Sequence, residues 1–273
     1  MAAHTISRTT IAAVLVATIA ALVGRAWLQI RLIQDGAQPL VAADISYLVV
    51  PPILILLLFP LWRSEKTFLI SQFDRKKLTW KLALSAIAIG VLVRLLWWSQ
   101  LIAGVSFGIY TSSDPNAIVG PTLSFQCASP TIVLLGFIVM AILVPLIEEI
   151  VHRGYFQTAL RHRGAIVSVL LSALVFAIFH KLASWPFAFL AGVIFGTQYW
   201  VTRSLWSSLI SHATINGLIQ VDWRCLSGQW NPRADELPLL LPGVTAVLVL
   251  VSSLLLLFFL IHKMATEARN SPR

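Results

Sequence analysis

Apolar residues run along this chain in long blocks separated by short polar stretches. A helix that spans a membrane needs about 20 apolar residues, because roughly 30 Å of hydrocarbon is crossed at about 1.5 Å per residue. Each apolar block is predicted to form one such helix: residues 11–33, 45–62, 81–109, 130–160, 165–181, 186–202, 204–221 and 238–262. The pattern therefore predicts an all-α fold, a polytopic transmembrane bundle of about eight helices.

Proline positions predict irregularities within two of these helices. Pro51 and Pro52 fall in the second block and Pro145 in the fourth. Proline has no backbone N–H and its ring clashes with the preceding turn, so we expect kinks there. The first block, from Ile11, is longer than the apolar core of a signal peptide, and we interpret it as an uncleaved helix.

Composition supports the bilayer as the solvent for most of the chain. Hydrophobic residues make up 58% and charged residues 11%, and the mean hydropathy is +0.85. A soluble domain has about a quarter charged residues. The pattern has no repeat, low-complexity tract or soluble segment, so residues 1–273 are predicted to form a single membrane domain. We expect the lipid bilayer as a partner and no nucleic acid.

The net charge of +9 is concentrated in particular loops. The loop between the second and third blocks, the turn after the fourth, and the C-terminal tail are rich in Lys and Arg, whereas residues 111–129 contain neither. Cytoplasmic loops carry such an excess, so eight spans place both termini in the cytoplasm of a multi-pass integral membrane protein. Nothing resembles an organelle signal, so we expect a prokaryotic cell membrane. Cys127 and Cys225 then lie on the same outer side of the membrane. If that side is oxidising, a disulfide can form between them.

Each ionisable side chain inside a membrane span raises the free energy of insertion by a few kcal/mol, so its presence there indicates a structural or functional role. These side chains form three clusters, Glu148 and Glu149 with Arg153, Phe176 with His180, and His212 with Asn216. Residues four apart share a helix face, so the second glutamate is predicted to pair with the arginine. Adjacent residues point about 100° apart on a helix. The first glutamate is therefore free to face a site.

The three clusters are also predicted to meet at one depth. If Arg163 and Gly164 form a hairpin turn, Glu148 and His180 lie at equal distances before and after it, and antiparallel helices place them level. His212 and its neighbour Asn216 lie on a later helix that a modest tilt brings close. A carboxylate, two imidazoles and a carboxamide in one place suit the activation of water and the stabilisation of an oxyanion.

The motifs Glu-Glu-x-x-x-Arg-x-x-Phe, Phe-x-x-x-His and His-x-x-x-Asn, in this order on successive helices, resemble those of the CAAX-protease and bacteriocin-processing family. This family of intramembrane glutamate endopeptidases is also called the Rce1 or Abi family. The core of the resemblance spans residues 132–220. It implies hydrolysis of a membrane-associated protein or peptide, for which a prenylated CAAX C-terminus is the best-known case.

The resemblance also implies a role for each matching residue. Glu148 would be the base that deprotonates water, His180 would hold that water, and His212 with Asn216 would stabilise the oxyanion. Glu149 and Arg153 would order the site. One departure is His152, where an aromatic residue is common. We expect this imidazole either to perturb the nearby carboxylate or to meet polar neighbours.

Other functions and a metal mechanism stay open at this point. A proton-coupled transporter could use the same acids and histidines, but no internal repeat supports one. A catalytically inactive scaffold or immunity protein is a further alternative. Glu148, His180 and His212 could bind zinc and leave a position for water. The His-Glu-x-x-His signature is absent, and we favour catalysis without a metal or other cofactor.

Two arginines lie inside apolar blocks away from these clusters. We expect Arg25 to extend its charge to the headgroups, because long basic side chains do so near helix ends. Arg94 is more central, and we expect an acidic or backbone partner for it.

Overall fold

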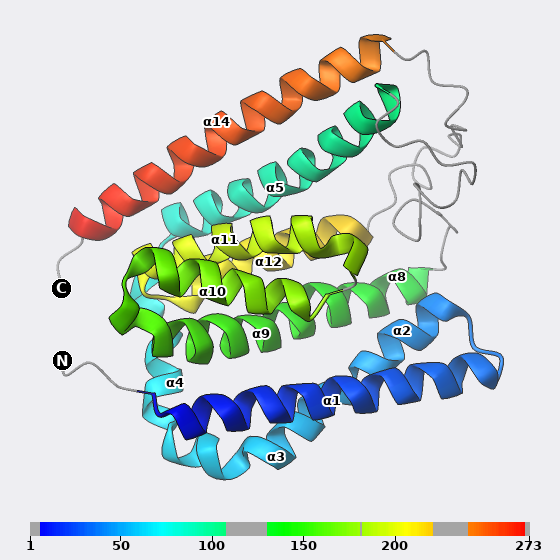
Figure 1. Ribbon diagram of the computed structural model, residues 1–273, viewed down its shortest axis with the longest axis vertical. Helices are drawn as coiled ribbons and strands as arrows, with labels where there is room; N and C mark the ends of the chain where they lie inside the picture. The colour runs from blue at the N-terminus through cyan, green and yellow to red at the C-terminus, as the bar shows by residue number, and fades with distance from the viewer. Residues whose placement is uncertain (1–5, 108–129, 181, 221–239, 271–273) are drawn as a thin grey trace.

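The computed structural model describes residues 6–107, 130–180, 182–220 and 240–270 (Figure 1). These residues form helices and short connections, with no strand among them. A helical segment occupies each predicted block, which confirms the all-α bundle. The segments are α1 (Arg8–Gln34), α2 (Pro39–Tyr47) with α3 (Val50–Ser64), α5 (Trp80–Ser106), a composite helix from Pro130 to Gln157, α10 (Ala165–Ile178), α11 (Trp185–Thr202), α12 (Leu205–Gln220) and α14 (Leu240–Asn270).

Among the described residues, five helices are long and apolar enough to cross a membrane, and α10, α11 and α12 are not among these five. The 14 residues of α10 extend about 21 Å at 1.5 Å per residue. α11 and α12 lie between α5 and α14 on one side and α1 and the composite helix on the other (Figure 1), whereas α10 has an exposed apolar face that includes Ile166, Leu170 and Leu174. Protein covers much of the surface of α11 and α12, so these two helices need not be uniformly apolar.

The proline positions are confirmed as sites of irregular backbone. The second block is interrupted at Leu48 and Val49, and α3 begins with Pro51 and Pro52 in its first turn. Proline is well placed there, because the first N–H groups of a helix have no partner within the helix.

The fourth block is one composite helix with four parts. They are α8 (Pro130–Gly136), the π-helical η2 (Phe137–Leu143), α9 (Val144–Glu149) and the π-helical η3 (Ile150–Gln157). Pro145 lies in the first turn of α9, directly after the first π-helical part. Such π-helical turns occur frequently at functional sites. They change the direction of the side chains that follow and therefore affect where the glutamates of α9 point.

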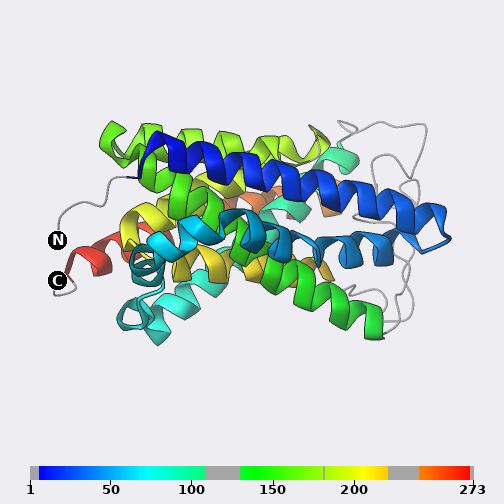
Figure 2. The ribbon, with the colours of Figure 1, turned by 90° about the horizontal axis from the view of Figure 1, so that it is seen from below.

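The basic connections lie at one end of the bundle, as the charge pattern predicted. The start of α1, the end of α14 and the connection that contains α4 (Lys66–Gln72) and η1 (Arg75–Lys77) share this end (Figure 2). The short η4 (Leu160–Arg163) and Gly164, with φ 89°, form the predicted hairpin turn before α10.

Small residues allow the central helices to approach closely. A methyl group added at Gly90 of α5 would lie 2.6 Å from the carbonyl oxygen of Ser211 on α12. One added at Gly192 of α11 would lie 2.9 Å from Cα of Ala173 on α10. Close backbone approach through small residues is a main source of stability between membrane helices. These contacts hold α12 against α5 and thereby set its position.

We therefore expect Gly90→Ala to destabilise the fold. The added methyl group must displace backbone, and overpacking of this kind costs about 1–3 kcal/mol. The midpoint of thermal unfolding in detergent should fall. Gly24→Ala is the control, because its methyl group would meet only Cδ1 at the flexible end of Ile53, at 3.2 Å. Equal midpoints for the two variants would contradict this packing.

The predicted sidedness of the termini can be measured with the two cysteines. Cys127 and Cys225 lie outside the described residues, and their disulfide stays a prediction. After reduction, a membrane-impermeant maleimide should label both in intact cells. An Arg75→Cys variant in a background without other cysteines should be labelled only after the membrane is opened, because this exposed position lies in the basic connection. The reverse pattern would invert the topology.

Candidate active site

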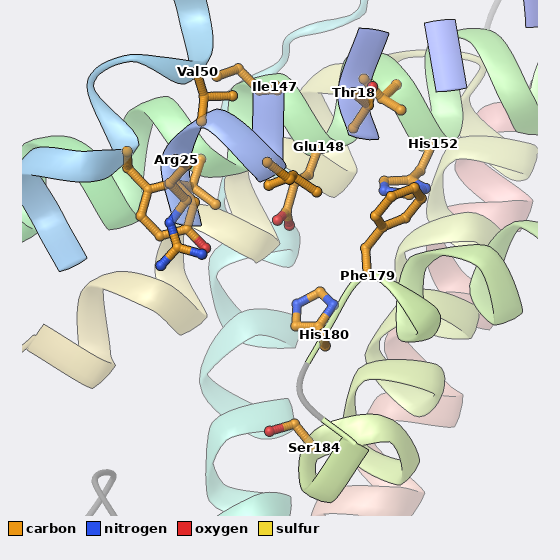
Figure 3. Close-up of a pocket in the computed structure, with 13 residues that line it drawn as sticks. Thr18, Arg25, Val50, Ile147, Glu148, His152, Phe179, His180 and Ser184 are labelled. Carbon is orange, nitrogen blue, oxygen red and sulfur yellow. The ribbon is translucent and has the colours of Figure 1, made fainter. Parts of the chain in front are cut away.

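A cavity of about 260 Å³ lies beside the composite helix. Its walls come from α1, the junction of α2 and α3, α9, η3 and the turn after α10 (Figure 3). Glu148 and His180 both line it, and in Figure 3 the carboxylate of one points toward the imidazole of the other. The equal depth predicted for these residues from the hairpin turn is thus consistent with the structure.

The two adjacent glutamates have different environments. Glu149 is completely buried, whereas the side chain of Glu148 is 23% exposed and lines the cavity. Oε1 of Glu149 accepts a hydrogen bond from Nη1 of Arg153 at 3.0 Å. The predicted pair is therefore present, and the predicted division between the two carboxylates is present with it.

Two aromatic rings pack against the Arg153 guanidinium. The Arg153 Cζ atom lies 4.5 Å from the ring centre of Phe176 and 5.3 Å from that of Phe195. Nη2 donates to the Gly192 carbonyl at 3.3 Å. A cation over aromatic faces is stabilised further when water is excluded. These contacts hold a fully buried arginine in one orientation and thereby orient Glu149.

His212 connects the two glutamates. Its Nδ1 is 3.0 Å from Oε1 of Glu149, and its Nε2 is 3.6 Å from Oε2 of Glu148. The ring stacks on Phe195 with 4.8 Å between centroids. Because the partner of Nδ1 is a carboxylate, which only accepts, Nδ1 carries a proton. The other ring nitrogen therefore faces the exposed glutamate.

His180 lies just beyond the end of α10, in the turn that follows Ile178. Its Nδ1 is 2.8 Å from the Phe176 carbonyl oxygen, and the two rings are 4.6 Å apart between centroids. A carbonyl can only accept, so Nδ1 donates and Nε2 keeps its lone pair in the neutral ring. An acceptor of this kind on the cavity wall can hold one proton of a water molecule.

Asn216 does not line the cavity with Glu148. Its Nδ2 donates to the Met140 carbonyl at 2.8 Å. In η2 the Val144 N–H donates five residues back, to Val139. The next donor in that register would be Pro145, which has no N–H. The carboxamide therefore satisfies a carbonyl that the helix leaves without a donor, and it keeps one N–H and its oxygen.

The side chain of His152 packs mainly against aromatic rings. The ring is buried and contacts Phe176 and Phe179 edge to face, with centroids 5.2 and 5.5 Å away. Its Nδ1 has no hydrogen-bond partner among the described residues. The imidazole thus packs as an aromatic residue does, which accounts for its presence at a position where aromatic residues are common.

The two isolated arginines both lie beside aromatic rings. Arg25 lines the cavity instead of extending toward headgroups, with its Cζ 3.7 Å from the ring centre of Tyr47. Arg94 is buried and lies over the rings of Trp97 and Trp98, at 4.7 and 5.0 Å. Its Nε and Nη1 have no hydrogen-bond partner among the described residues. Aromatic faces thus contact this guanidinium, and none of the ion pairs between described residues includes it.

The cavity walls from α1 and α2 are the part of the site that sequence reasoning missed. Arg25 and Tyr47 face Glu148 from helices outside every motif. The one available signal was a charge within an apolar block.

The arrangement of the candidate ligands bears on a metal mechanism. Among the residues that the structure describes, no three His, Cys, Asp or Glu side chains are grouped as a metal site. Zinc binding by Glu148, His180 and His212 stays the alternative prediction. Catalysis without a metal stays a prediction.

Comparison with known protein families gives one match, over part of the chain. Residues 130–218 match the family model described as "Type II CAAX prenyl endopeptidase Rce1-like". The match contains all three motifs and confirms the resemblance inferred from them. Comparisons with curated proteins and with solved structures give no match.

Arg153→Ala is expected to reduce both the yield of folded protein and any activity. It leaves Glu149 as a buried carboxylate without its arginine, and breaking a buried pair costs about 3–5 kcal/mol. The double change Glu149→Gln with Arg153→Gln should recover yield relative to Arg153→Ala. Monodisperse protein after purification in detergent is the measurement, and the exposed Arg63→Ala is the control. Without recovery in the double variant, the pair would not be the reason for the loss.

Proposed function

We propose that this protein is an intramembrane endopeptidase in which Glu148 activates the attacking water. One observation carries the proposal. Oε2 of Glu148 is a buried oxygen at the cavity wall without a hydrogen-bond partner among the described residues. Oε1 of its neighbour Glu149 is taken by Arg153 and His212, and Glu149 does not line the cavity. A carboxylate with a free lone pair beside a cavity is the arrangement that a general base needs.

The proposed reaction assigns one task to each group. Water lies between Glu148 and Nε2 of His180, gives a proton to the carboxylate and attacks the peptide carbonyl carbon. His212, when both of its nitrogens are protonated, donates from Nε2 to the oxyanion, and Glu149 stabilises that charged ring. Glu148 then returns the proton to the amide nitrogen as the C–N bond breaks. The products are a free amine and a new carboxylic acid, which then releases its proton to water.

Asn216 has a second role in this proposal. One N–H donates to the Met140 carbonyl, and the proposal assigns the second N–H to the oxyanion. Loss of one oxyanion donor reduces turnover by about 10²–10³-fold. The proposed substrate is a membrane-associated protein or peptide, and a prenylated C-terminus of the CAAX type is the class that the family match supports.

Glu148→Gln tests the base directly. The amide keeps the size and hydrogen bonding of the side chain but removes its basicity, so turnover should fall by at least about 10²–10⁴-fold. The thermal midpoint in detergent should stay close to that of the wild type. Asp35→Asn, an exposed change on the connection after α1, should retain activity. Cleavage of a quenched prenylated CAAX peptide is the measurement, and full activity in Glu148→Gln would exclude this base.

Treatment with a chelator distinguishes water activation by Glu148 without a metal from water activation by bound zinc. Protein treated extensively with a chelator should keep its activity if Glu148 and His180 alone activate water. If stoichiometric zinc is bound and its removal abolishes cleavage, the metal-free mechanism is wrong, although the protease assignment stands. An inactive scaffold would show no cleavage dependent on Glu148 under either condition.

A further inference from the structure

Arg25 is a cation in the same cavity as the proposed base. The residue belongs to α1, far outside the segment that matches the family, and it lines the cavity together with Tyr47, Glu148 and His180. In Figure 3 its guanidinium lies to one side of the glutamate carboxylate, opposite His152. A cation within a membrane bundle is expensive and marks a functional position by default.

The guanidinium is only partly satisfied by the protein. Nη2 donates to Gln29 at 3.1 Å, and the Tyr47 ring covers one face. The Nε atom is buried and has no hydrogen-bond partner among the described residues. None of the ion pairs between described residues includes Arg25. The contrast is with Arg153, which has a carboxylate partner at 3.0 Å.

The missing anion is therefore expected to arrive with a ligand. Guanidinium groups present several N–H donors in a plane and bind carboxylates through two of them at once. A carboxylate that entered this cavity would meet that donor set beside Glu148, which repels anions and so restricts the carboxylate to the arginine side. The cavity, about 260 Å³ in volume, is large enough for a short peptide segment and small enough to define its direction.

We propose that Arg25 binds the C-terminal carboxylate of the peptide substrate and thereby selects bonds close to a free C-terminus. The inference rests on the proposed protease function. An extended residue spans about 3.3–3.6 Å. A carboxylate one to three residues beyond the scissile bond thus lies about 4–11 Å from the carbonyl that is attacked. Arg25 is then a specificity residue, whereas Glu148 and His180 act on the scissile bond.

Two prenylated, internally quenched CAAX peptides test the proposal, one with a free C-terminal carboxylate and one with a carboxamide. Wild-type protein should cleave the carboxylate peptide with a kcat/KM about 10–100-fold higher, as expected for a hydrogen bond to a charged group. Arg25→Gln should remove most of this preference by lowering the value for the carboxylate peptide, with a much smaller effect on the carboxamide. Arg31→Gln, an exposed change on the same helix, should keep the preference.

Three outcomes would overturn the proposal. In the first, the preference for the carboxylate peptide persists in Arg25→Gln. In the second, kcat/KM falls equally for both peptides, which would indicate a structural role for Arg25. Alternatively, activity could depend on Arg25 only in nanodiscs that contain an anionic lipid, in which case the arginine binds a lipid phosphate.

Failure of the protease function has a separate signature. If wild-type protein cleaves neither peptide, the binding of the same two peptides to Glu148→Gln protein decides the role of Arg25. The Kd should be about 10–100-fold lower for the carboxylate peptide, and Arg25→Gln added to Glu148→Gln should abolish the difference. Equal Kd values for the two peptides before that change would reject the carboxylate site.

Discussion

The Glu149 carboxylate is completely buried and is shared by Arg153 and His212, each at 3.0 Å. A charge in such a place is tolerated only when partners and hydrogen bonds replace the water that it has lost. Those partners come from the same helical segment and from α12, and Phe195 of α11 packs against both. The position of three helices therefore depends on this one carboxylate, and so does the direction of the imidazole that faces Glu148.

Polar groups in the bundle fall into two kinds. Most are satisfied by other helices, as when Ser211 donates to the Ala86 carbonyl at 2.7 Å and Asn216 donates to Met140 at 2.8 Å. These bonds join one helix to another. Glu148 and Arg25 instead keep unsatisfied buried atoms, and both line the cavity. The proposed chemistry is assigned to these residues because their remaining hydrogen bonds are free to go to water and substrate.

Irregular backbone in one helix determines where a second helix attaches to it. The π-helical η2 and Pro145 leave the Met140 carbonyl without a helical donor, and Asn216 supplies one from α12. A defect in one helix thus becomes the attachment point of another, close to the glutamates of α9. A regular helix here would present its carbonyls to its own N–H groups and would have no need of the carboxamide.

The sequence by itself determined the features that depend on local spacing. Apolar block length identified the helices, and the four-residue spacing identified the pair of Glu149 and Arg153, because helical periodicity is independent of the rest of the fold. The turn at Gly164 placed Glu148 and His180 at one depth for the same reason, since the rise per residue is constant.

Tertiary structure alone decided which helices face the cavity and with which side. The rotation of α1 brings Arg25 onto the cavity wall, and the close approach of α5 at Gly90 fixes α12 and with it His212. Neither rotation nor approach is encoded in the spacing within one helix, because both result from packing between segments far apart in the chain. The partner of Asn216 was unpredictable for the same reason, since it required the π-helical register of η2 as well as the contact between α12 and that segment.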